Sequence, residues 1–574
     1  MRQAMTMRWG IGVLAWALLG ATAASAEVPR DAREAVRRIA IQHNGRHKPF
    51  DSFARETLKQ VTGSPRHGDE DPVETILSII GFPDRWQARP LIAVPFVPLR
   101  EALGMDRHAA RISYNDLVAT RKLMRMLPAI VAKQQRDEKL TMLEEETMDA
   151  FNRFAAFSRL LEQELALVPP PVSWAAGAVS AFADTGPLGP ETGSRMVPTP
   201  STASPTWVSI AQSAGSQEPQ QTALREAWQA LIAAIRRDDD AAVIAAARQL
   251  RERLRATNPA AYPAAWRLEL EVFSNRVSPF GAARWAYALA VLGLLGGLAK
   301  TGWARAGTVA LWAGFVLHAA GIVIRVILGG RPPVSNFYET TLWLPLVAVA
   351  LALVFERIYR VRYFALAAAI LAAIMLVLAD ALPLDSSISP VVAVLRSNLW
   401  LTIHVLTIVA SYGALALAMI LAHLYGVLYL SRRARRSALV SLDTVLYRAI
   451  QVGVVLLAGG IMLGAVWANA SWGRYWGWDP KETWALITLL WFLAVLHGRF
   501  AGWISGVGVA LATISGFFLL LMTYYGVSFY LVGLHSYAGG HARPLPPLLI
   551  GYVVAEVVFM VLVGAAAMGR RRLT

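Results

Sequence analysis

The second half of the chain contains nine apolar segments, each long enough to cross a lipid bilayer as a helix. They lie near residues 283–299, 307–328, 339–356, 363–382, 400–430, 449–470, 484–500, 505–530 and 547–568. A spanning helix needs about 20 mainly apolar residues, and its backbone groups must be hydrogen-bonded within the protein. The composition agrees, with 55% hydrophobic and 16% charged residues over 574 positions. The sequence therefore predicts an all-α polytopic membrane protein.

Basic residues predict the orientation of this membrane part, since Lys and Arg are enriched in loops that face the cytoplasm. Here they gather in every second loop and in the C-terminal tail: near 300–305, 357–362, 432–448, 499 and 570–572. We therefore expect these loops and the C-terminus on the cytoplasmic side, and the loops at 471–484 and 531–546 outside. Because this placement explains the net charge of +16, the charge does not indicate a nucleic-acid-binding face.

Residues 1–26 have the pattern of a secretory signal peptide. Arg2 and Arg8 precede a short apolar centre, and the sequence Ala-Ser-Ala stands just before Glu27. An uncleaved anchor helix is the alternative interpretation. Either one places the chain from Glu27 onward outside the cytoplasmic (inner) membrane of a bacterium, on the periplasmic side.

Residues 27–278 predict an extracytoplasmic, mostly helical domain that precedes the transmembrane domain, 279–574. Segments 137–167 and 221–256 have apolar residues at helical spacing. The stretch between them, near 168–206, is rich in Pro, Gly, Ser and Thr, which indicates a flexible linker or an irregular excursion. No catalytic constellation stands out in this region.

The chain contains no cysteine. This excludes disulfides, a CxxC redox pair, a thiolate metal site and a cysteine nucleophile. Any thiol chemistry at this protein must therefore use the sulfurs of another protein.

A tryptophan-rich loop, WGRYWGWDPKETW (472–484), separates the sixth and seventh apolar segments. Two histidines flank it on the same predicted side: His404 lies one turn into the fifth segment, and His535 lies just past the eighth. Two neutral imidazoles can ligate a haem iron from opposite faces, while indole rings pack against the macrocycle. The pattern indicates a haem site at the outer surface, with an interfacial aromatic belt as the alternative. The aromatic candidates are Trp472, Trp476, Trp478 and Trp484.

Four charged residues of the loop allow different interpretations. Arg474 and Lys481 could meet haem propionates. Asp479 and Glu482 are candidate acid–base groups, but capping and pairing at the start of the seventh segment is the favoured interpretation.

Three further histidines lie within the predicted spans, where an ionisable residue is costly and indicates a functional site. His497 is about thirteen residues into the seventh segment, so roughly 20 Å below the outer surface at 1.5 Å per residue. His318 is near the middle of the second segment, and His423 is near the inner end of the fifth.

The loop resembles the tryptophan-rich "WWD" signature of the cytochrome c assembly proteins, specifically of the CcsA (ResC) family of System II. The run WDPKETW (478–484) is typical of this branch, whereas the related CcmC and CcmF proteins have other residues after the WD. GGRPPVSNFYET (329–340) is similar to a second motif of the family. The segments that carry His404, His497 and His535 resemble its three histidine-bearing segments.

The resemblance extends over nearly the whole chain and is strongest in 307–545. Residues 44–63 and 268–280 resemble a long form of the family with an N-terminal extracytoplasmic extension.

The resemblance also implies a function. Family members act with the membrane protein CcsB (ResB), export haem b and attach its vinyl groups to the thiols of a CxxCH motif in an apocytochrome c, as part of a holocytochrome c synthase (haem lyase) complex. A thiol-reducing, thioredoxin-like protein is a further implied partner. By resemblance, His404 and His535 are the axial ligands of the outer haem iron, and His497 belongs to an inner haem site. The implied haem-binding residues of the loop are Trp472, Trp476, Trp478, Asp479 and Trp484.

Several alternatives stay open. The second inner ligand belongs to CcsB in the family, so a separate CcsB supplies it here, or His318 or His423 substitutes. An electron-transfer membrane cytochrome with a permanent bis-His haem, a CcmC- or CcmF-type haem-handling protein and a transporter of another solute are competing functions. No residue stands out as catalytic.

Overall fold

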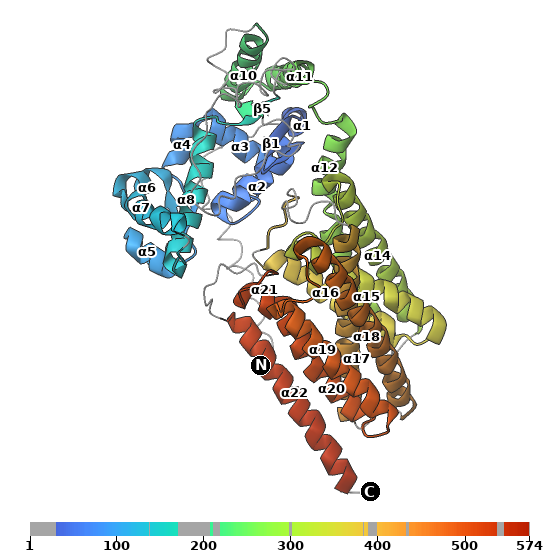
Figure 1. The fold of residues 1–574 in the computed structure, drawn as a ribbon. Coiled ribbons are helices and arrows are strands. Elements are labelled where there is room, and N and C mark those ends of the chain that lie inside the picture. The colour runs from blue at the N-terminus through green and yellow to red at the C-terminus, as the bar shows by residue number, and fades with distance from the viewer. Residues whose placement is uncertain are drawn as a thin grey trace, which may run out of the picture. The chain divides into compact units, whose positions relative to one another are not determined.

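The computed structural model describes residues 30–136, 138–169, 207–209, 219–297, 301–382, 384–388, 399–431, 436–535 and 545–572. The predicted signal peptide and most of the predicted linker lie outside these residues. The chain divides into two compact units (Figure 1). The first comprises Met1–His43, His47–Leu123 and Asp149–Val272; the second comprises Asn44–Arg46, Met124–Met148 and Phe273–Thr574.

The chain before residue 278 is mainly helical, as predicted. Its helices are α1 (Arg30–Arg37), α2 (Phe50–Thr62), α3 (Pro72–Gly81), α4 (Pro83–Gln87), α5 (Val97–Leu103), α6 (Tyr114–Thr120), α7 (Lys122–Gln135), α8 (Met142–Leu161), α10 (Pro219–Arg237), α11 (Asp240–Thr257) and α12 (Ala265–Val277). Three two-stranded sheets were not predicted: β1 (Ala40–His43) with β2 (Arg46–Pro49), β3 (Pro90–Ala93) with β4 (Arg111–Ser113), and β5 (Ala166–Val168) with β6 (Val208–Ser209). Strands of two to four residues are too short for a period-two pattern to stand out.

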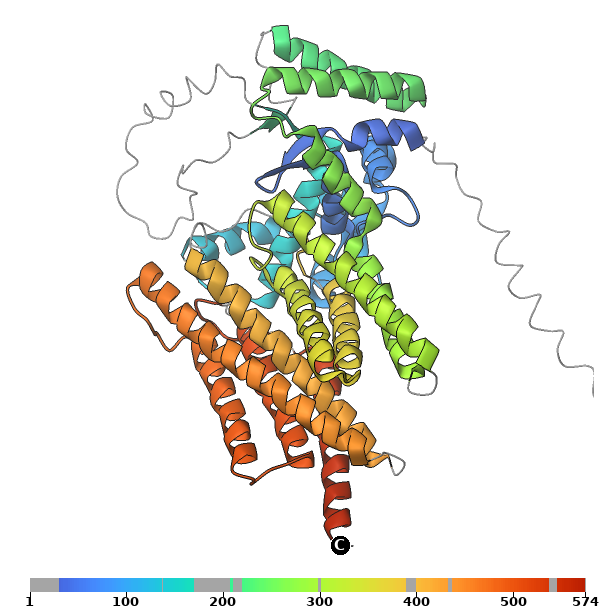
Figure 2. The same cartoon turned by 90° about the vertical axis from the view of Figure 1, so that its right-hand side faces the viewer.

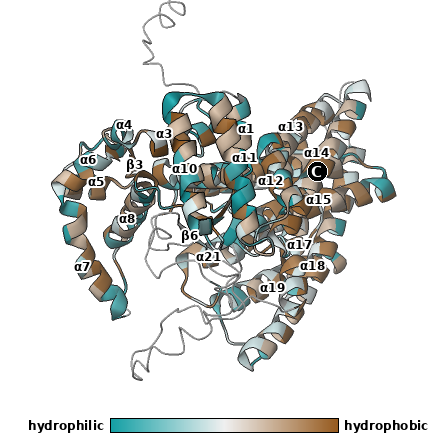
Figure 3. Ribbon diagram, turned by 90° about the horizontal axis from the view of Figure 1, so that it is seen from above, coloured by the Kyte–Doolittle hydropathy of each residue, from teal (hydrophilic) through white to brown (hydrophobic). Residues whose placement is uncertain are grey.

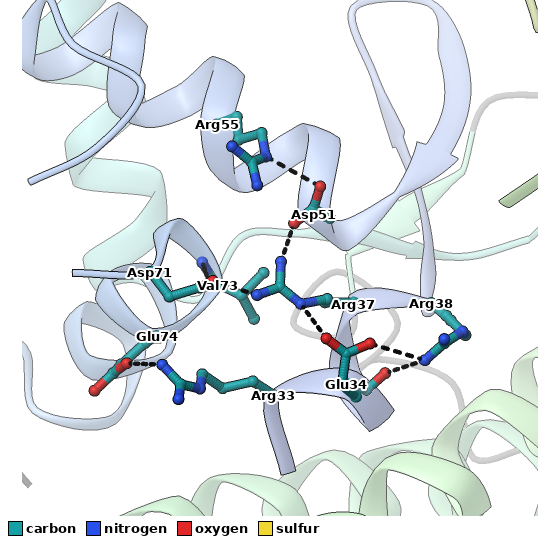
Figure 4. A network of polar contacts seen from close by, with 9 residues as sticks. All are labelled: Arg33, Glu34, Arg37, Arg38, Asp51, Arg55, Asp71, Val73 and Glu74. Atoms are coloured by element: carbon teal, nitrogen blue, oxygen red, sulfur yellow. Dashed lines mark hydrogen bonds and ion pairs between the residues drawn. The ribbon is translucent and has the colours of Figure 1, made fainter. Parts of the chain in front are cut away.

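A network of ion pairs joins α1, α2 and α3 in the first unit (Figure 4). Arg37 of α1 bonds to Asp51 of α2 and to Asp71, the residue that caps α3. Arg33 bonds to Glu74 of α3 at 2.7 Å. A buried charge is tolerated when it is paired and hydrogen-bonded, so this network fixes the mutual placement of the three helices.

The second unit is a bundle of long apolar helices. They are α13 (Pro279–Gly296), α14 (Thr301–Gly329), α15 (Phe337–Tyr359), α16 (Tyr363–Ala381), α17 (Leu399–Leu430), α18 (Arg436–Trp472), α19 (Pro480–Phe500), α20 (Val507–Leu521), a π-helical turn (Met522–Gly526), α21 (Val527–Tyr530) and α22 (Pro547–Arg572). Over the described residues, nine helices are long and apolar enough to cross a membrane.

Helix α17 is the centre of this bundle, since 78% of its apolar window is buried. It lies beside α18 along much of its length (Figure 2) and also packs on α15, α16 and α20. Glycines allow the close approach of α18: a Cβ on Gly453 would lie 2.5 Å from Leu415 of α17. Hydrophobic residues predominate along α13, α14 and α17, whereas hydrophilic and hydrophobic residues alternate along α10 and α11 of the first unit (Figure 3).

Candidate functional site

The tryptophan-rich loop connects α18 to α19, and its last residues form the cap of α19. The side chain of Asp479 accepts a hydrogen bond from the backbone N–H of Lys481 at 3.0 Å, and Glu482 accepts from the N–H of Asp479 at 3.2 Å. Pro480 occupies the first helical position, where its missing N–H costs nothing. The capping interpretation of Asp479 and Glu482 is confirmed.

Asp479 has a second role, which is to orient His535. Its Oδ2 atom lies 2.9 Å from Nδ1 of His535, and its Oδ1 atom accepts from the N–H of Leu534 at 2.6 Å. Burial alone would raise the pKa of Asp479, but the hydrogen bonds from the His535 side chain and from two backbone N–H groups outweigh it and lower that pKa. The ionised carboxylate can only accept, so Nδ1 of His535 carries the proton and Nε2 remains available as a ligand.

His404 is oriented in the same manner by a backbone carbonyl. Its Nδ1 atom lies 2.8 Å from the carbonyl oxygen of Gly460 in α18, so Nδ1 donates and Nε2 is available. Gly464 opens the space for this ring: a Cβ there would lie 2.6 Å from Cε1 of His404. Among the described residues, neither His404 nor His535 has a hydrogen bond at Nε2.

Trp467, near the end of α18, contacts both histidines. Its ring centroid is 6.3 Å from that of His404, with the planes 10° apart, and 6.3 Å from that of His535. Trp472 packs on Trp467 at 4.7 Å and meets the edge of His535 at 6.3 Å. The fold thus brings together His404 and His535, which are far apart in the sequence, around a pair of indoles.

Sequence reasoning missed Trp467 because it lies at the end of an apolar span, where a tryptophan is an ordinary membrane-interface residue. A usable signal was present. Gly460 and Gly464 are spaced by four residues on the same helix as Trp467, and small residues at this spacing indicate a close approach of another element.

The other three tryptophans make no ring contact with the two histidines among the described residues. Trp476 and Trp478 pack edge to face at 5.7 Å. Trp478 is 70% exposed and has a φ of +56°, a conformation that is uncommon outside glycine and often marks functional sites. Trp484 lies in the first turn of α19 and is partly buried.

Lys481 points into the bundle, so its suggested contact with haem propionates has no support here. Its ammonium donates to the hydroxyl of Ser528 at 2.8 Å and to the carbonyl of Tyr524, on the π-helical turn, at 3.3 Å. The Tyr524 hydroxyl in turn bonds to Thr340 and Thr341 of α15, at 2.9 and 3.1 Å. Lys481 therefore ties the loop to the start of α15.

The second sequence motif, 329–340, caps α15 and pairs charges at its first turn. Asn336 accepts from the N–H of Glu339 at 2.8 Å, and Glu339 is buried between Arg325 and Arg331, at 3.1 and 2.7 Å. This motif therefore forms the N-terminus of α15, where Arg325 and Arg331 pair with the carboxylate of Glu339.

The three histidines within the spans have separate surroundings. His318 is fully buried and lies 3.3 Å from the Tyr287 hydroxyl. His423 bonds through Nε2 to Glu556 of α22 at 2.8 Å. The side chain of His497 is exposed on the surface of the bundle, and its Nδ1 atom is hydrogen-bonded to the carbonyl of Leu493 in the same helix at 2.7 Å. No hydrogen bond or ring contact between described residues joins any two of them.

Comparison with known proteins decides the family. The family model described as "Cytochrome C assembly protein" matches residues 334–535, which include His404, His497, His535 and the tryptophan-rich loop. Cytochrome c biogenesis protein CcsA of Prochlorococcus marinus (strain MIT 9515) is 37% identical over 254 residues, which are 38% of this chain and 79% of that protein. The chain belongs to the CcsA family.

A CcsA protein of Guillardia theta gives a similar match, 37% identical over 252 residues and 82% of its length. Protein NrfI of Wolinella succinogenes is 29% identical over 527 residues, 88% of this chain. The part of this CcsA-family protein before its transmembrane unit therefore also has a counterpart in a relative. The chain spans about half the length of NrfI, 54%. The role in cytochrome c biogenesis and the multi-pass membrane architecture follow from these matches and from the nine apolar helices.

Proposed function

We propose that this CcsA-family protein binds haem b between His404 and His535 on the outer side of the membrane and presents it for attachment to apocytochrome c. The observation that carries the proposal is the matched orientation of the two imidazoles. Each is fixed through Nδ1, each keeps Nε2 available, and both contact Trp467.

The residues present fit a haem. Among the described residues, no group of three or more His, Cys, Asp or Glu side chains could hold a bare metal ion. Two imidazoles suit an iron whose other four ligands belong to a macrocycle, and the indoles of Trp467 and Trp472 offer apolar surface beside them. Haem, when bound, supplies the vinyl groups that add to thiols.

The contribution of the chain itself is positioning. Asp479 and the Gly460 carbonyl fix the two imidazoles, which hold the bound tetrapyrrole in one place and raise the effective concentration of vinyl groups for a docked thiol. The reacting sulfurs come from the apocytochrome, because this sequence has no cysteine.

The proposal includes a placement in the cell and partners. The alternation of basic loops supports a bacterial inner-membrane protein whose loop at 471–484 and domain at 27–278 are periplasmic, after a signal peptide at 1–26, with a cytoplasmic C-terminus. A CcsB-like membrane protein and a thioredoxin-like reductant that keeps the apocytochrome thiols reduced are the expected partners.

Replacing Asp479 by Asn is expected to lower the haem-to-protein ratio about tenfold, because loss of a carboxylate behind a ligating histidine typically costs 10- to 100-fold in metal affinity. The asparagine keeps an acceptor for the cap of α19 but loses the charge that fixes the tautomer of His535. Asp385→Asn, an exposed change in the same unit, is the matched control. An unchanged ratio in Asp479→Asn would show that Asp479 acts on the helix cap alone.

Covalent transfer tests the function. The purified protein, together with a CcsB-type partner and haem, is incubated with a reduced peptide that carries CxxCH, and the mass of the peptide is measured. We expect a mass gain of one haem, and none with an AxxAH peptide. A spectrum of bound haem without any transfer to the peptide would favour an electron-transfer cytochrome instead.

A further inference from the structure

Trp467 carries a polar group that has no partner among the described residues. The indole is 4% exposed, and its Nε1 atom is buried with no hydrogen-bond acceptor in the part of the chain that the structure describes. A buried tryptophan N–H normally finds an acceptor, since leaving it unpaired destabilises the protein. The same holds for Nε1 of Trp476 in the adjoining loop.

The position of Trp467 links this unpaired donor to the proposed haem site. Its ring touches the rings of His404 and His535, which are the two residues proposed to bind the iron. A ligand held by both imidazoles would therefore lie against this indole. A hydrogen-bond acceptor on that ligand would satisfy the N–H.

The cations nearby are poorly placed for this task. Lys481 is occupied by Ser528 and Tyr524 on the side of α20 and α21. Arg474 is exposed and folds over Gly477, where a Cβ would lie 2.8 Å from its Cζ atom. Among the described residues, the buried donors without a partner at the site are thus the neutral indoles of Trp467 and Trp476.

We propose that the Trp467 N–H donates a hydrogen bond to a propionate carboxylate of the bound haem, with Trp476 available for the second propionate. This inference rests on the proposed function. In haem the carboxylates lie on the edge opposite the vinyl groups. Trp467 therefore selects one orientation, in which the carboxylate edge faces the loop and the vinyl edge is presented to the apocytochrome.

The test compares haemin with haemin dimethyl ester, which keeps the iron and the vinyl groups but lacks the carboxylates. Binding of each to the full-length protein in detergent is titrated by the Soret absorption. We expect the wild type to bind haemin at least about tenfold more tightly than the ester, since a hydrogen bond to a charged group is worth that factor or more. In Trp467→Phe, which keeps an aromatic ring, the affinity for the ester stays the same and the ratio falls towards one.

Trp207→Phe is the matched control, because Trp207 of the first unit also has a buried N–H without an acceptor among the described residues. That variant should keep the wild-type ratio. An unchanged ratio in Trp467→Phe would overturn the inference, and so would an equal loss of both ligands, which would assign the indole a packing role. Failure of the proposed function gives a different result, in which His404→Ala and His535→Ala bind haemin as well as the wild type does.

Discussion

Replacing both His404 and His535 by alanine is expected to reduce cytochrome c maturation to background while the protein still inserts into the membrane. Both side chains lie at one site with Nε2 available, and the two alanines would remove the two imidazoles that contact Trp467 among the described residues. Membrane insertion should be preserved because His535 lies outside the helices, after α21, and alanine at position 404 keeps the apolar length of α17. Covalent haem in the cytochrome fraction, measured by peroxidase staining, is the measurement.

The single variants add a sharper test. Each should be rescued in part by imidazole in the medium, which can fill the vacated axial position. His108→Ala, an exposed change in the first unit, is the control and should mature cytochromes normally. Normal maturation in the double variant would eliminate the outer bis-His site.

The second prediction concerns the haem content of a complex between this protein and a CcsB-type partner, and the role of His497 in it. We expect His497→Ala to lower the haem content of the complex that co-purifies with a CcsB-type protein, and His318→Ala and His423→Ala to have smaller effects. His497 is exposed on the outer face of α19 and bonds only to its own helix among the described residues. An imidazole that faces lipid is costly, so a second membrane protein or a ligand that it helps to hold is expected to cover it.

The other two histidines already have protein partners, Tyr287 for His318 and Glu556 for His423. Replacing either of them should lower the protein yield and change the haem-to-protein ratio little. His423→Ala, for example, leaves the buried carboxyl group of Glu556 without its hydrogen-bond partner. The ratio is measured for all three variants, with and without the partner. Full haem occupancy in His497→Ala would remove the inner site, and an empty inner site in His318→Ala would place the missing ligand in this chain.

The membrane fold could be predicted from the sequence because hydrophobic length determines it almost alone. The nine apolar segments correspond to α13–α20 and α22. Hydropathy does not determine where a helix begins beyond its apolar run, and α18 begins at Arg436, well before the apolar run at 449. It also does not reveal the π-helical turn at Met522–Gly526 inside the eighth span. Such a turn depends on packing, here on the bond from Thr523 to the Trp484 carbonyl at 3.0 Å.

The two candidate histidines could be predicted from the sequence, but the residues that orient them could not. His404 and His535 stand out because an imidazole at the edge of a span needs a reason. The contacts of Asp479 with His535 and of Gly460 with His404 join residues 56 positions apart in each case. They depend on the register of α18 against α17 and on the path of the chain after α21. The spacing of Gly460 and Gly464 indicated a close approach to this part of α18, but the contacts of Trp467 with both histidines depend on the packed structure.

The absorption and electron paramagnetic resonance spectra of the purified protein test the outer haem site most directly. We expect a six-coordinate, low-spin haem with two histidine ligands in the wild type. In His404→Ala and in His535→Ala, each measured without added imidazole, the outer haem should lose one axial ligand and become high-spin or dissociate. Low-spin spectra that are unchanged in both variants would contradict the assignment of these two histidines as the ligands.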